Sequence, residues 1–185
     1  MIRFFAQAAV LVVAGLALGG CPMGETKTAV PAKKPPAPDY QAPVGQVAKP
    51  TNLRAICYTD ADLAATRSRM VQQEMSGAAL QCQNPGGGRA LQGAYESFIG
   101  KFSGELATNA RSLQQLAGRK RFNVDVLVTE IANRTAQKAP VDREFCTRSQ
   151  RTLEWALSPQ VTSLAQVPPP YDLGPEMNIH SCTAP

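Results

Sequence analysis

Residues 59–88, TDADLAATRSRMVQQEMSGAALQCQNPGGG, decide the fold of this chain. Mostly apolar side chains recur there at three- and four-residue intervals, which is the spacing of one face of an α-helix. This stripe comprises Leu63, Arg67, Met70, Val71, Glu74, Ala78 and Cys82. Thr59, Asp60 and Asp62 suit a helix N-terminus, and Asn84–Gly88 suits a helix end. The stretch therefore predicts a helix from about residue 60 to 82.

Three further helices are predicted downstream. The second carries a long apolar stripe that ends at Gly118 and is typical of a core-facing surface: Leu91, Tyr95, Phe98, Phe102, Leu106, Leu113 and Leu116. A third is expected around Val124–Ile131, although residues 122–128 are β-branched enough that a strand stays possible. Pro140 and Asp142 open the fourth, which ends before Pro159.

These helices predict an all-α domain. Residues 51–185 have the length of one domain. Helices joined by short loops tend to lie antiparallel, so we expect a four-helix up-down-up-down bundle. Past Val167, three prolines begin an extended tail that reaches Cys182.

The first twenty residues have the pattern of an export signal. Arg3 supplies positive charge, and Ala8–Leu18 is an unbroken apolar run that is too short for a membrane span of about 20 residues. The motif Leu18-Gly19-Gly20-Cys21 resembles the lipobox of bacterial lipoproteins. The resemblance implies cleavage before Cys21, a diacylglyceryl group on its thiol and an acyl chain such as palmitate on its new amine.

The resemblance also implies a location. Several acyl chains anchor a protein stably in a membrane, whereas one chain anchors it only marginally. Pro22 stands where an Asp would mark retention in the inner membrane. We therefore expect a lipid anchor in the outer membrane, with the domain facing the periplasm.

Residues 21–50 have the composition of a tether, rich in Pro, Lys and Ala. Seven of the fifteen prolines fall between residues 22 and 50, where Tyr40 is the only aromatic residue. Such a composition cannot build a core, so we expect a disordered spacer without a binding role of its own.

Four cysteines remain once Cys21 is assigned to lipid, and an exported domain favours two disulfides among them. Cys57 and Cys82 flank the first helix, whose length of about 33 Å excludes a bond between them. The end of the first helix and the start of the fourth lie at one end of the expected bundle. We therefore expect Cys82 to pair with Cys146, and Cys57 with Cys182.

Charge and cysteine spacing disfavour several function classes. Residues 51–185 hold 14 basic and 12 acidic side chains, a net charge of only +2, so nucleic acid is not expected as a partner. We also expect no metal and no cofactor, because His180 is the only histidine and no Cys-x-x-Cys is present. The basic run Arg119-Lys120-Arg121 suits a helix C-terminus, and it is also a candidate contact for an anionic lipid or envelope polymer.

No convincing catalytic set emerges, so we expect no enzyme. Glu96-Ser97 faintly resembles the Glu-Ser pair of lytic transglycosylases, but the later glycine-rich motif of that family is missing. Gly86–Gly88 lacks the Lys and Ser or Thr of a phosphate-binding loop. The sequence favours a membrane-anchored, non-catalytic binding or scaffolding module with an envelope protein or cell-wall component as partner. A small glycan-cleaving enzyme acting on peptidoglycan, with Glu96 or Glu105 lining a groove, stays the alternative.

Overall fold

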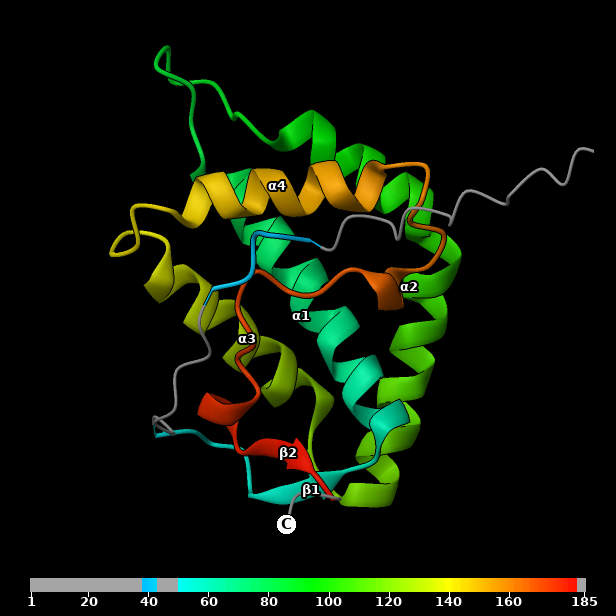
Figure 1. The fold of residues 1–185 in the computed structure, drawn as a ribbon. Coiled ribbons are helices and arrows are strands. Elements are labelled where there is room, and N and C mark those ends of the chain that lie inside the picture. The colour runs from blue at the N-terminus through cyan, green and yellow to red at the C-terminus, as the bar shows by residue number, and fades with distance from the viewer. Residues whose placement is uncertain (1–37, 43–49, 183–185) are drawn as a thin grey trace, which may run out of the picture. The chain divides into compact units, whose positions relative to one another are not determined.

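The computed structural model describes residues 38–42 and 50–182 of the chain. The predicted signal segment, Cys21 and most of the predicted tether lie outside these residues. The described part contains four α-helices, two short 3₁₀ helices and a two-stranded ladder (Figure 1).

The first two helices form a hairpin. Helix α1 (Asp60–Gln81) begins at Thr59, whose side chain accepts a hydrogen bond from the backbone N–H of Asp62 while the Asp62 carboxylate accepts one from Thr59. Helix α2 (Gln92–Lys120) runs back along α1 in Figure 1. The turn between them depends on Gly87, whose φ of +85° favours glycine. These bounds confirm the helices predicted from the opening stretch and the second stripe.

Helix α3 (Val124–Lys138) packs on α1 and resolves the open choice between helix and strand. Asn123 caps it by accepting hydrogen bonds from the backbone N–H groups of Asp125 and Val126. This cap and the apolar pair Leu127 and Ile131, both fully buried, outweigh the β-branched composition.

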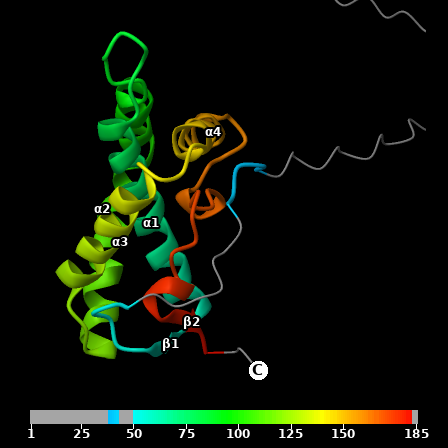
Figure 2. The same cartoon turned by 90° about the vertical axis from the view of Figure 1, so that its left-hand side faces the viewer.

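Helix α4 (Phe145–Leu157) is arranged differently from the expectation. Figure 1 shows α4 crossing α1 and α2, and Figure 2, turned by 90°, shows α4 end on while α1 and α2 lie side by side. The helical class and the four helices are confirmed, but an up-down-up-down order of all four is not established. From this crossing position, α4 buries Phe145, Leu153 and Ala156 in the core.

The chain after α4 returns along α1 to the opposite end of the domain. It passes through η1 (Leu164–Gln166) and η2 (Pro175–Met177) before β2 (Ile179–Ser181) pairs in parallel with β1 (Ile56–Tyr58). This ladder aligns Cys57 with His180 and was not predicted. The tail buries Leu173, Met177 and Ile179 in the core, so it is an integral layer of the domain.

Candidate functional site

All four cysteines of the domain are joined in disulfides. Cys82 is bonded to Cys146 and Cys57 to Cys182, with Cα–Cα distances of 5.6 and 4.6 Å. These are the two pairs expected from the order of the helices. The first bond joins the end of α1 to α4, and the second closes the β1–β2 ladder.

The basic run at the end of α2 divides into two kinds of residue. The Arg119 guanidinium donates to the Asp62 carboxylate at 2.7 Å and so joins the end of α2 to the start of α1. Burial raises the pKa of Asp62, but hydrogen bonds from Thr59 and the charge of Arg119 outweigh it and leave the pKa below its ordinary value. Arg119 is thus committed to the fold. Within the described residues, Lys120 and Arg121 form no side-chain ion pair, and Arg121 is exposed in a left-handed cap with φ of 58°.

The two carboxylates considered for glycan cleavage lie on the exposed surface of α2. Glu96 is exposed and accepts a hydrogen bond from Gln92 one turn earlier. Glu105 is also exposed, and its carboxylate accepts from the Ser163 hydroxyl at 2.8 Å and the Leu164 N–H at 2.9 Å. Glu105 therefore fixes the start of η1. His180 lies exposed on β2, where the ladder places it beside Cys57.

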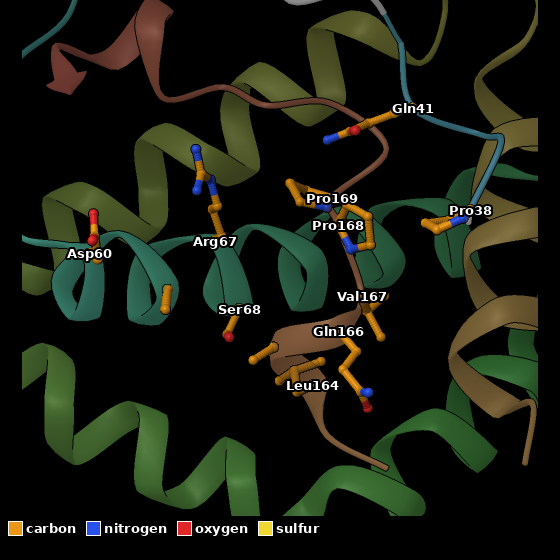
Figure 3. Close-up of a pocket in the computed structure, with 12 residues that line it drawn as sticks. Pro38, Gln41, Asp60, Arg67, Ser68, Leu164, Gln166, Val167, Pro168 and Pro169 are labelled. Carbon is orange, nitrogen blue, oxygen red and sulfur yellow. The ribbon is translucent and has the colours of Figure 1, made fainter. Parts of the chain in front are cut away.

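A groove lies between α1 and the returning chain, and Figure 3 shows the residues around it. Its volume is about 370 Å³. Helix α1 contributes a row of small and polar side chains, and the opposite wall is largely aliphatic and proline. The lining residues are Pro38, Gln41, Asp60, Ala64, Arg67, Ser68, Leu164, Ala165, Gln166, Val167, Pro168 and Pro169. Arg67 is held by an ion pair of 3.3 Å to Asp172.

Residues 38–42, which we call the docked segment, lie against the returning chain beside this groove. The Tyr40 hydroxyl donates to the Pro168 carbonyl at 2.9 Å, and the Ala42 N–H donates to the Pro170 carbonyl at 3.0 Å. The Tyr40 side chain is buried, with 2% of its surface exposed. The expectation of a disordered tether is therefore wrong for these residues, because the one aromatic ring among the prolines is buried against the domain.

Beneath the same chain lies a buried carboxyl group, Glu74 of α1. One of its oxygens accepts a hydrogen bond from the Tyr171 N–H at 3.1 Å, while Oε1 has no hydrogen-bond partner within the described residues. Burial raises the pKa of Glu74 well above its ordinary value, the Tyr171 hydrogen bond and Lys138 lower it, and Asp172 raises it further. Glu74 is thus favoured in its neutral form in the folded protein.

A Glu74→Gln variant tests this buried acid. Glutamate in the unfolded chain ionises above about pH 4.5, whereas folding retains the proton, so the free energy of unfolding of the wild type falls as pH rises above 4.5 toward the folded-state pKa. Each pH unit within that window costs about 1.4 kcal/mol. Glutamine keeps the shape and can accept from Tyr171, so we expect E74Q to be the more stable protein at pH 7.

Urea unfolding of both proteins at pH 4 and pH 7 measures the effect. The advantage of E74Q should be present at pH 7 and absent at pH 4, where both side chains are neutral. Glu96→Gln on the exposed face of α2 is the matched control and should leave the pH dependence unchanged. An equal difference between E74Q and wild type at the two pH values would contradict the neutral buried acid.

Two of these features carried a signal in the sequence. Tyr40 is the only aromatic residue among the prolines of residues 22–50, which distinguishes it from the rest of the predicted tether. Glu74 falls on the apolar stripe of α1, and a carboxylate at a core position is uncommon unless it is paired or neutral. Neither signal identifies the partner, because Pro168 is 128 residues away from Tyr40 and Tyr171 is 97 residues away from Glu74.

Within residues 38–42 and 50–182, no group of three or more His, Cys, Asp or Glu side chains could hold a metal ion. None of the helices described is long and apolar enough to cross a membrane. No family model, no curated protein and no solved structure matches this chain.

Proposed function

We propose that this chain is a lipid-anchored envelope protein whose domain serves as a non-catalytic binding or scaffolding module. The observation that carries the proposal is the pairing of the cysteines. The two disulfides use Cys57, Cys82, Cys146 and Cys182, and Cys21 is the one cysteine of the sequence that they leave over. Two disulfides favour an oxidising compartment, and lipidation would consume the fifth thiol there.

The anchor follows from the lipobox in this proposal. Cys21 carries the acyl chains, and position 22 lacks the Asp that would mark retention in the inner membrane, so the protein is anchored in the outer membrane with its domain facing the periplasm. The partner is an envelope protein or a cell-wall component.

The binding role is supported by the surface of the domain. The groove between α1 and the returning chain is open to the surface, and its walls rest on a framework that the two disulfides constrain. A contact with an anionic lipid or polymer would fall to Lys120 and Arg121, because Arg119 is occupied by Asp62.

Replacing Cys21 with Ser tests the anchor. Without the thiol, the lipid cannot be attached, and stable anchoring requires more than one acyl chain. We expect wild-type protein in the outer-membrane fraction. The C21S protein should be absent from that fraction, and it should either be soluble in the periplasm or keep its uncleaved signal segment. Intact-mass measurement of the wild type should show cleavage before Cys21 and the added mass of one diacylglyceryl group and one further acyl chain.

The anchor test also needs a control and a result that would contradict it. Pro22→Asp is the matched control, which should keep the lipid and shift the protein to the inner membrane. An unmodified Cys21 or cleavage at another position would contradict the proposal, whatever the domain binds.

A further inference from the structure

The docked segment is held by the contacts with which proteins recognise extended peptides. Its backbone supplies a donor, the Ala42 N–H, and its one aromatic ring is buried. Asp39 adds a longer ion pair of 3.9 Å to Arg151, with both side chains largely exposed. A backbone hydrogen bond combined with one side-chain anchor is a common mode of peptide recognition.

The receiving surface, which we call the docking face, consists of Pro168 and Pro170 with Arg151 and Trp155 of α4. The proline rings restrict φ at Pro168 and Pro170, and the proline that follows Pro168 also favours extended backbone there, so the acceptor carbonyls have limited freedom before any ligand arrives. The backbone that follows these prolines is fixed from below, because Glu74 accepts from the Tyr171 N–H. The docking face is therefore preorganised by the core.

The docked segment itself is held to the docking face by few contacts. Two hydrogen bonds, one buried ring and one exposed ion pair are set against the conformational entropy lost when five residues become ordered. Cavities also flank the segment on both sides, since Pro38 lines the groove next to α1 and a second cavity that includes Tyr40 and Trp155.

We propose that the docking face is a binding site for extended tyrosine-containing peptides, and that residues 38–42 are its intramolecular, reversibly bound ligand. With the segment docked, 16 residues (22–37) separate Cys21 from the domain; with it released, 28 residues (22–49) do. In fully extended polyproline II geometry these lengths span about 50 and 87 Å. The consequence for reach rests on the proposed lipid anchor, whereas the binding site does not.

Hydrogen exchange on the mature chain carrying Cys21→Ser tests reversibility without any lipid. The Ala42 N–H should exchange at least about 100-fold faster than the Met75 N–H in α1, because the segment opens while the domain stays folded. Tyr40→Ala should accelerate Ala42 exchange by at least tenfold more and leave Met75 almost unchanged. Glu96→Ala on the exposed face of α2, away from the docking face, is the control and should have little effect on either amide.

Trp155 gives a second readout, since it is the only tryptophan of the chain and lines a cavity with Asp39 and Tyr40. In Tyr40→Ala its emission should shift to longer wavelength and acrylamide quenching should increase. A synthetic peptide of residues 36–44, added to the Tyr40→Ala protein, should reverse both changes, and the same peptide with Ala at position 40 should not.

Several results would overturn the proposal. Equal exchange of Ala42 and Met75 in the wild type would show that the segment leaves only when the whole domain unfolds. Failure of the native peptide to restore the Trp155 signal would show that the face binds nothing in trans. Both experiments use unlipidated protein, so a negative result would leave the proposed lipid anchor untouched, and a failed anchor would leave this binding site untouched.

Discussion

Replacing Cys57 and Cys182 together with Ser should lower the free energy of unfolding by about 5 kcal/mol. The bond joins residues 125 positions apart, so in the chain-entropy description its loss releases nearly the whole domain in the unfolded state. It also removes the fixed point of the tail in the folded state. The parallel ladder has only three residue pairs, and the Cys182 N–H donates to the Tyr58 carbonyl at 2.9 Å.

Urea unfolding of the wild type and the double variant measures this loss. Hydrogen exchange should show which part of the domain opens first: the Ile179 N–H should lose its protection before the amides at the centre of α1. The matched comparison is Cys82→Ser with Cys146→Ser, whose shorter loop of 64 positions predicts a loss of about 4 kcal/mol without early release of β2. A loss below about 1 kcal/mol for Cys57 and Cys182 would show that the ladder holds the tail without the bond.

The helices could be predicted because their signals are local. The stripe of α2 places Phe98, Phe102 and Leu113 in the core as expected, since helical periodicity is set by backbone geometry alone. The ends were also predictable where a side chain caps the backbone, as Thr59 does for α1. For the disulfides, the length of the first helix excluded only a bond between Cys57 and Cys82, and the choice between the two remaining pairings rested on the expected bundle order; the structure has the expected pairs although that order is not established.

The parts that could not be predicted depend on contacts between distant segments. The crossing of α4 depends on how the side chains of Phe145 and Leu153 fit the core, and periodicity does not encode a crossing angle. The docked segment lacks any regular pattern, so only its tyrosine distinguished it. The basic run showed its charge in the sequence but not that Arg119 is used by Asp62, 57 residues away.

A buried ionic cluster between α3 and the tail also depends on residues that are distant in the sequence. The Arg134 guanidinium is 3.6 Å from the Glu176 carboxylate and donates to the Pro50 carbonyl at 2.8 Å. Lys138 lies 3.0 Å from the other oxygen of Glu176, and Glu130 contacts Arg134 from one turn earlier. The side chains of Arg134 and Glu176 are each only 7% exposed, so both buried charges depend on the ion pairs of this cluster for compensation.

Replacing Arg134 with Met should therefore lower the free energy of unfolding by about 3 to 5 kcal/mol, because it leaves the buried Glu176 charge with Lys138 alone and the Pro50 carbonyl without its donor. Methionine keeps much of the volume of the arginine stem, so lost packing contributes little to this difference. Thermal or urea unfolding at pH 7 measures it. Arg151→Met on α4, where the ion pair is exposed and 3.9 Å long, is the matched control and should cost less than about 1 kcal/mol.

A double variant separates the charge from the packing. Adding Glu176→Gln to Arg134→Met removes a carboxylate that is then left with Lys138 alone, so the second substitution should cost clearly less stability in the variant than it costs in the wild type. If the second substitution instead costs as much in the variant as it does in the wild type, the two side chains are not coupled, and the tail is held to α3 by its apolar residues Leu173 and Met177 rather than by this ionic cluster.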